Sequence, residues 1–186
     1  TQYIETGMYK RVLVIGAEIL SRVLNFKDRN TCVLFGDGAG AAVLGPVPEG
    51  YGILGMDMGA DGNGGKYLNI PASGTAILPT DEAREKGLTY VHMDGKEVYK
   101  FAVKGMGQTA EKALERAGID KSEIDILVPH QANIRIIQSA AKRLDLPMEK
   151  VFVNIDKYAN TSGASIPIAL DEAHREGRIK RGDIVV

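Results

Sequence analysis

The sequence predicts an α/β protein with a largely parallel sheet, because short apolar segments alternate along the chain with amphipathic helical segments. Apolar runs such as residues 11–16 and 124–128 have the length and the flanking residues of strands buried on both faces. Residues 97–117 and 134–144 instead repeat apolar side chains at helical spacing, with charged side chains on the opposite face. The chain has 186 residues, enough to bury a core in one or two compact units.

Four apolar runs in the first half of the chain predict strands. They cover residues 11–16, 31–35, 41–44 and 51–58, and each is bounded by charged residues or by glycine and proline. Residues 1–7 before them are typical of the last turns of a helix that ends at Gly7. The first half is therefore expected to supply a helix end followed by strands.

Two glycine-rich segments interrupt this half. Residues 36–40 lack the Lys-Ser/Thr pair of a P-loop and the glycine spacing of a dinucleotide-binding loop. We interpret them as a tight turn between two buried strands, where glycine permits close backbone approach. Residues 59–86 show little periodicity and many Gly, Pro, Asn and Asp residues, so we expect an irregular loop and the best internal boundary of the chain.

The second half alternates strands and helices more regularly. Strands are expected at residues 90–93, 124–128 and 151–155 and from residue 183 onward. Helices are predicted over residues 97–117, 134–144 and 161–176, the first and last of which end at Gly118 and Gly177.

Two glycines lie inside the first of these helices. Gly105 and Gly107 each cost about 1 kcal/mol relative to alanine in a helix interior. Their presence indicates tight packing of the helix backbone at both positions.

The composition excludes several classes of protein. The 23 basic and 24 acidic side chains leave a net charge of −1, which argues against nucleic acid or an anionic membrane as a partner of the whole chain. No apolar run approaches the ~18 residues of a membrane span and no secretory signal is recognised, so a cytoplasmic location is the default expectation. One cysteine cannot form an intrachain disulfide or a cysteine-rich zinc site, and no metal site is predicted.

That cysteine, Cys32, is expected to be structural. It lies within an apolar run and has no neighbouring cation or helix start to lower its pKa. Free cysteine is also among the most frequently buried residue types.

Polar side chains that follow two strands are the strongest candidates for a site. His130 comes directly after the strand at 124–128 and before a helix, and Asn160 lies between the next strand and helix. Open α/β sheets bind ligands at these carboxyl ends. His130 and Asn160 can therefore direct hydrogen-bond donors at one carbonyl oxygen, as in an oxyanion hole. The alternatives are a loop histidine beside a helix capped by Asn133, and a helix capped by Asn160, Thr161 or Ser162.

Basic residues gather near His130. Arg135, Lys142 and Arg143 lie on the helix that follows it, and Lys100 and Lys104 lie on the preceding helix. Such residues form either a solvated helix face or a surface that docks an acidic partner or a phosphate, and the sequence favours neither.

Three segments resemble β-ketoacyl-acyl carrier protein synthase III. They are residues 128–133 (VPHQAN), residues 158–167 (YANTSGASIP) and, less specifically, residues 35–44 (FGDGAGAAVL). The similarity runs across essentially the whole chain. It implies a thiolase-like fold of two similar βαβαβαββ halves, here incomplete at both ends. Residues 1–87 would be the end of the N-terminal half with an excursion loop, and residues 88–186 most of the C-terminal half.

The resemblance also implies an activity. Members of this family are usually homodimers that condense an acyl-CoA, typically acetyl-CoA, with malonyl-acyl carrier protein, releasing CoA and carbon dioxide. The product is a 3-oxoacyl-acyl carrier protein that initiates type II fatty acid synthesis. No separate cofactor is implied, because CoA and phosphopantetheine enter as parts of the substrates.

The family's functional residues match positions of this chain. His130 and Asn160 match the catalytic pair that stabilises the enolate formed by decarboxylation. The resemblance assigns contacts with CoA or its pantetheine arm to Arg29, Gly95, Tyr99 and Asn133. It assigns docking of the acidic carrier protein to Lys100, Arg135, Lys142 and Arg143.

Two elements of the family's site are expected outside the chain. The nucleophilic cysteine would precede Thr1, because Cys32 does not align with it, and a glycine-rich segment with an oxyanion donor would follow Val186. Two alternatives remain: a related 3-oxoacyl or polyketide synthase that uses other acyl-CoAs, and a non-catalytic thiolase-fold subunit if the upstream cysteine does not exist.

Overall fold

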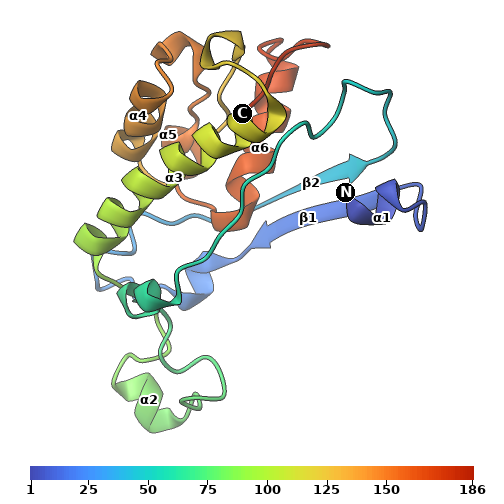
Figure 1. The fold of residues 1–186 in the computed structure, drawn as a ribbon. Coiled ribbons are helices and arrows are strands. Elements are labelled where there is room, and N and C mark those ends of the chain that lie inside the picture. The colour runs from blue at the N-terminus through green and yellow to red at the C-terminus, as the bar shows by residue number, and fades with distance from the viewer.

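The computed structural model describes all 186 residues (Figure 1). The strands are β1 (Val12–Glu18), β2 (Gly38–Leu44), β3 (Leu68–Asn69) and β4 (His92–Met93). The α-helices are α1 (Gln2–Glu5), α2 (Asp81–Glu85), α3 (Gly95–Ala117), α4 (Ile134–Arg143), α5 (Ile155–Tyr158) and α6 (Ser165–Arg175). Short 3-10 helices are η1 (Leu20–Val23), η2 (Gly62–Tyr67), η3 (Lys121–Glu123), η4 (Met148–Lys150) and η5 (Ser162–Ala164). Figure 1 shows the long helices grouped together, the β1–β2 hairpin extending from them, and α2 projecting away.

The strands predicted at residues 11–16 and 41–44 are confirmed as β1 and β2, which pair antiparallel from Val12 opposite Leu44 to Glu18 opposite Gly38. Their expected burial on both faces is wrong in this structure, since Leu13 is 59% exposed and Ile15 is 62% exposed. Helix α6 and η5 pack against the hairpin but do not cover these side chains.

The strand predicted at residues 31–35 is wrong. The Asp28 carbonyl accepts from the backbone N–H groups of Thr31 and Cys32, and its carboxylate accepts from the Thr31 hydroxyl at 2.9 Å. The Asp28 carboxylate also accepts from the Asn30 backbone N–H at 3.0 Å, and these local bonds fold the segment into turns. Only Phe35 pairs like a strand residue, in parallel with Asn160.

The tight turn predicted at residues 36–40 is also wrong, since its last three residues open β2. The reason proposed for its glycines nevertheless holds. A Cβ added to Gly38 would lie 2.9 Å from Ile168 Cδ1, and one added to Gly40 would lie 2.8 Å from the Pro167 ring. Both glycines allow β2 to approach α6 closely.

Residues 51–58 form no strand, contrary to the prediction. They lie along α3, where a Cβ added to Gly55 would come within 2.2 Å of the Ala113 carbonyl oxygen. Arg116 of α3 donates to the Met56 carbonyl at 2.6 Å and pairs with the Asp57 carboxylate at 2.9 Å. The segment therefore bonds to a helix rather than to a sheet.

The loop expected at residues 59–86 contains η2, β3 and α2, and its strand β3 pairs with β4. Thr80 caps helix α2 by accepting a hydrogen bond from the Ala83 backbone N–H on its side chain. The division of the chain at residue 87 stays a prediction.

The parallel sheet predicted for the second half is present as three short segments. Leu127 pairs in parallel with Val151, and Ile126 pairs in parallel with Val185. Residues 124–128 thus lie between the other two segments. The expected strand at residues 151–155 is shorter than predicted, because Ile155 already begins α5.

Helices cover both faces of this sheet. One face contributes Leu127 to a core cluster with Leu114 of α3, with Ile137 and Ala141 of α4, and with Ile124, Leu144 and Val151. The other face contributes Ile126 and Val128 to a cluster with Phe152, Ala169 and Ala173. Alternate residues of one strand therefore face different helix layers, as in an α/β sheet.

The predicted helices at residues 97–117 and 134–144 are confirmed. Asp94 caps α3 by accepting from the Lys96 and Glu97 backbone N–H groups, and Gly118 ends it at φ 67°. The helix predicted at residues 161–176 begins as η5 and continues as α6. No helix of the structure has both the length and the apolar character needed to cross a bilayer.

The packing predicted for the two glycines of α3 is confirmed at one of them. A Cβ on Gly107 would lie 2.4 Å from Arg143 Cδ, so Gly107 lets the Arg143 side chain cross the helix. The prediction is wrong at Gly105, where nothing lies within 4 Å of an added Cβ.

Candidate active site

His130 lies just beyond the central parallel segment and is half-buried. Its Nδ1 is 2.5 Å from the Ser165 hydroxyl oxygen at the start of α6. Burial lowers the pKa of His130 below its ordinary value of 6.5. The imidazole is therefore neutral at neutral pH, with one ring nitrogen carrying a proton and the other accepting.

Asn160 is fixed by both its backbone and its side chain. Its N–H donates to the Leu34 carbonyl at 3.0 Å, and its carbonyl accepts from the Gly36 N–H at 3.0 Å. Its side-chain Oδ1 accepts from the Ser162 backbone N–H at 2.9 Å. Because the amide oxygen faces the backbone, the amide NH₂ group remains as a donor directed elsewhere.

The backbone around Asn160 is strained on both sides. Ala159 has φ 58° and ψ −160°, and Ser162 has φ 49°. Side-chain-bearing residues rarely adopt a positive φ, and such conformations cluster at functional sites.

A buried glutamine connects the loops of the two candidate residues. The Gln131 amide donates to the carbonyls of Pro129 at 2.9 Å and Phe152 at 3.2 Å, and it accepts from the Asn154 N–H at 3.0 Å. Asn154 in turn donates to Glu172 of α6 at 2.7 Å. Gln131 therefore serves the framework of the site.

The hairpin supports the same site from another side. The Gly163 backbone N–H donates to Glu18 at the end of β1, at 3.1 Å. A Cβ on Gly16 would lie only 2.4 Å from the Gly163 carbonyl oxygen. The turn that follows Asn160 thus rests directly on β1.

Sequence reasoning did not assign roles to Ser165, Gln131, Glu18 or Gly16. Ser165 lies within one of the recognised motifs, but nothing in the sequence shows that it contacts His130. Glu18 and Gly163 are 145 residues apart in the chain, so no local pattern could have paired them.

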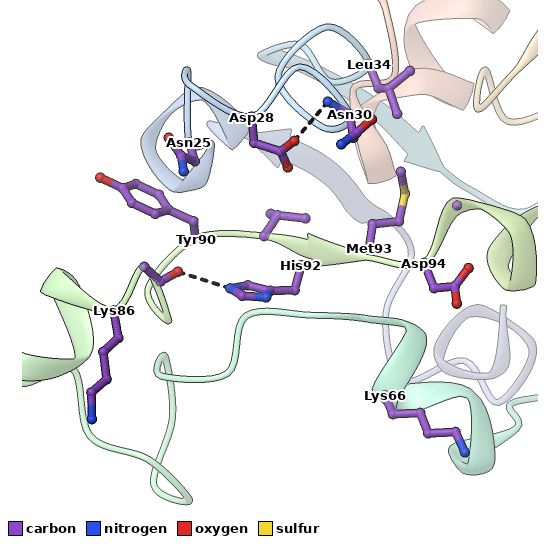
Figure 2. A pocket seen from close by; sticks show the side chains of 13 residues that line it. Asn25, Asp28, Asn30, Leu34, Lys66, Lys86, Tyr90, His92, Met93 and Asp94 are labelled. Atoms are coloured by element: carbon purple, nitrogen blue, oxygen red, sulfur yellow. Dashed lines mark hydrogen bonds between the residues drawn. The ribbon is translucent and has the colours of Figure 1, made fainter.

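The residues expected to contact CoA are only partly gathered. An open pocket of about 970 Å³ is lined by Asp28, Asn30, Lys86, His92 and Gly95, among others (Figure 2). Gly95 borders this pocket, and Arg29 lies between two residues that do. Figure 2 shows His92 turned toward the Gly87 carbonyl, 3.1 Å from its Nε2. His130 and Asn160 do not line it.

The other two expected contacts, Tyr99 and Asn133, lie outside this pocket. Tyr99 is 38% exposed on α3. Asn133 caps α4 by accepting from the Arg135 N–H at 2.8 Å, so the capping alternative is realised there. The bond uses the amide oxygen of Asn133, so its NH₂ group can still donate a hydrogen bond.

The structure divides the expected docking residues into two groups. Lys100 pairs with Glu97 at 2.7 Å, and Arg143 pairs with Glu111 at 2.6 Å. Arg135 and Lys142 are exposed on α4 and make no ion pair. These two have no acidic side chain within ion-pair distance in the structure.

Two family profiles match most of the chain. The profile described as 3-oxoacyl-[acyl-carrier-protein (ACP)] synthase III matches residues 1–62. The profile of the C-terminal part of the same enzyme matches residues 114–186.

Individual proteins agree. The β-ketoacyl-[acyl-carrier-protein] synthases III of Caldanaerobacter subterraneus and Clostridioides difficile are each 60% identical to this chain over 185 residues, which is 100% of the chain and 56% of each relative. A crystal structure of the synthase III from Thermus thermophilus is 47% identical, with a TM-score of 0.88 over 99% of this chain and 56% of that one. The priming β-ketosynthase of the R1128 polyketide pathway is 36% identical, with a TM-score of 0.81 over 99% of this chain and 54% of that one.

These relatives carry the thiolase-like fold expected from the sequence. The chain spans about half the length of the curated relatives it matches. With both profiles, the sequence identities and the fold in agreement, the chain belongs to the β-ketoacyl-acyl carrier protein synthase III family.

Proposed function

We propose that this chain forms part of an enzyme that condenses an acyl-CoA, with acetyl-CoA as the expected primer, with malonyl-acyl carrier protein. The observation that carries the proposal is the pair formed by a neutral His130 and an Asn160 whose amide oxygen is held by the backbone. Each side chain then offers an N–H donor, His130 from the end of the segment at 124–128 and Asn160 from the loop that follows α5 and pairs with Phe35. Family membership supports the same reaction.

The proposed reaction has two stages. A cysteine thiolate outside these residues attacks the acyl-CoA thioester and releases CoA, which leaves an acyl-enzyme thioester. The malonyl thioester then loses carbon dioxide, and the bond electrons form an enolate whose oxygen accepts from His130 and Asn160. The enolate carbon attacks the acyl-enzyme carbonyl and expels the cysteine thiolate. The 3-oxoacyl-acyl carrier protein, carbon dioxide and the released CoA together account for every carbon of the two substrates.

Substrate binding follows the same proposal. Arg29, Gly95, Tyr99 and Asn133 contact CoA or the pantetheine arm, and Lys100, Arg135, Lys142 and Arg143 dock the acidic carrier protein. Arg135 and Lys142 contribute most to docking, because Glu97 and Glu111 already offset part of the charge of Lys100 and Arg143. No cofactor is required beyond the carriers within the substrates, and the enzyme acts as a cytoplasmic homodimer.

The test uses the full-length enzyme with His130→Ala or Asn160→Ala. Each variant loses one donor and should decarboxylate malonyl-acyl carrier protein about 10²–10³-fold more slowly. Acylation by acetyl-CoA, measured by intact-protein mass spectrometry, should continue in both. Normal condensation by either variant contradicts the assigned roles.

Asn160→Asp is the matched variant for the fold. It keeps the oxygen that accepts from the Ser162 N–H but removes the amide donor. It should therefore fold like the parent enzyme while losing decarboxylation. Absence of any acyl adduct in the parent enzyme would instead favour a non-catalytic subunit.

A further inference from the structure

We propose that Ser165 is a positioning residue that holds the proton of His130 on Nε2, the nitrogen that faces away from α6. The inference rests on the proposed function, because it concerns how His130 becomes a donor to the enolate oxygen. It starts from the 2.5 Å approach between Ser165 Oγ and His130 Nδ1. That distance alone does not say which atom donates.

The surroundings of Ser165 decide the direction of the bond. Ser165 is 2% exposed, and its Oγ also accepts from the Gln131 backbone N–H at 3.3 Å. A hydroxyl has one proton to donate, and His130 Nδ1 is the acceptor that the structure provides for it. If Nδ1 carried a proton instead, the hydroxyl proton would be buried without a partner, which folded proteins avoid.

The Gln131 N–H that fixes this arrangement is itself immobile. The side chain of Gln131 is buried and bonded to Pro129, Phe152 and Asn154, as described above. Its backbone therefore presents the N–H to Ser165 in a constant direction. The chain of donors runs from the Gln131 N–H to the Ser165 hydroxyl and from that hydroxyl to Nδ1.

The consequence for His130 follows from imidazole chemistry. A neutral ring whose Nδ1 accepts must carry its proton on Nε2. The lowered pKa that burial gives His130 keeps the doubly protonated ring from replacing this form at neutral pH. Ser165 thus sets both the tautomer and the ring orientation without contacting substrate, much as partners of metal-bound histidines do.

The decisive experiment is ¹⁵N NMR of the full-length enzyme labelled at histidine, without substrate and at neutral pH. The His130 signals are assigned by their disappearance in His130→Ala. We expect an unprotonated Nδ1 and a protonated Nε2 in the unsubstituted enzyme. A proton on Nδ1 overturns the proposal without any variant of Ser165.

Variants of Ser165 test the effect on the reaction. Ser165→Ala should mix the tautomers of His130 and slow malonyl decarboxylation about 10–100-fold, a range typical of residues that orient a functional histidine. Acylation by acetyl-CoA should be unchanged. Ser165→Thr keeps a hydroxyl and should restore the spectrum and the rate. Ser139→Ala removes a half-buried hydroxyl on α4 as the matched control and should alter neither.

The outcomes separate this inference from the proposed function. If His130→Ala abolishes decarboxylation but Ser165→Ala changes neither spectrum nor rate, the positioning role is wrong and the function stands. If the spectra behave as expected but His130→Ala decarboxylates normally, the tautomer is set as proposed and the function is wrong.

Discussion

Replacement of Gly16 by alanine tests whether β1 positions the turn that carries Asn160. The added Cβ would lie 2.4 Å from the Gly163 carbonyl oxygen, 2.8 Å from the Gly163 carbonyl carbon and 3.1 Å from the Ala164 nitrogen. Real Cβ atoms essentially never approach another heavy atom closer than 3.0 Å, so the turn and β1 must separate by about 0.6 Å. The obstructing atoms belong to the backbone and cannot rotate away.

The cost of this shift has two parts. Overpacking of this kind lowers the free energy of unfolding by about 1–3 kcal/mol. A displacement approaching 1 Å at a catalytic group can reduce a rate about 10²-fold, so we expect malonyl decarboxylation to fall about 10–100-fold. Urea denaturation and a decarboxylation assay of the full-length enzyme measure the two effects.

Gly105→Ala provides the control for this prediction. Nothing lies within 4 Å of its added Cβ, so decarboxylation should be unchanged and α3 should gain up to about 1 kcal/mol. If Gly16→Ala retains both the stability and the rate of the parent enzyme, the turn does not depend on β1 and the reasoning fails.

Five further predictions concern four single residues. Ala159→Gly relieves a positive φ and should raise the free energy of unfolding by about 1 kcal/mol in urea denaturation; a less stable variant would contradict this. Because burial lowers the His130 pKa, decarboxylation should persist as the pH falls through 6.5 and decline only below it, whereas a midpoint at or above 6.5 is inconsistent with a buried neutral ring. The free energy of unfolding should likewise be highest above pH 6.5 as far as His130 contributes to it. It should decrease as the pH falls from 6.5 toward the lower pKa of the folded state, because the unfolded chain binds the proton first. Arg135→Glu should raise KM for the carrier-protein substrate more than KM for acyl-CoA, and equal rises would remove the docking role. Cys32→Ala should leave condensation intact, and a folded but inactive variant would show that Cys32 is not merely structural.

The helices could be predicted from the sequence because their signals are local. Asp94 and Gly118 mark both ends of α3, and the apolar positions of α4 repeat at helical spacing. The strands at residues 31–35 and 51–58 were predicted wrongly because apolar content does not reveal a pairing partner. The first segment is folded by the Asp28 carboxylate and carbonyl, and the second lies against α3.

The candidate residues could be chosen from the sequence because polar side chains beyond the end of a predicted strand are detectable locally. His130 directly follows the segment at 124–128, as open α/β sheets place their ligand sites, whereas α5 separates Asn160 from the segment at 151 and Asn160 pairs with Phe35. The contacts that hold His130 and the turn after Asn160 could not be predicted from the sequence. Ser165 is 35 residues from His130, and Glu18 is 145 residues from Gly163. The four basic residues also look alike in sequence, and only Glu97 and Glu111 distinguish the paired from the unpaired ones.

A local backbone bond is compatible both with the binding role proposed for Asn133 and with the catalytic role proposed for Asn160. Asn133 accepts from the Arg135 N–H, and Asn160 accepts from the Ser162 N–H, so each uses its amide oxygen to close a local turn. An asparagine has two ends, and fixing the oxygen leaves the NH₂ group pointing in one direction. At Asn160 the bond from the Ser162 N–H would therefore supply the orientation that an oxyanion donor needs before substrate arrives. A sequence pattern that predicts a cap at a strand end is thus no evidence against catalysis there. A catalytic asparagine is distinguished from one that only caps a turn by the group that its free NH₂ can reach.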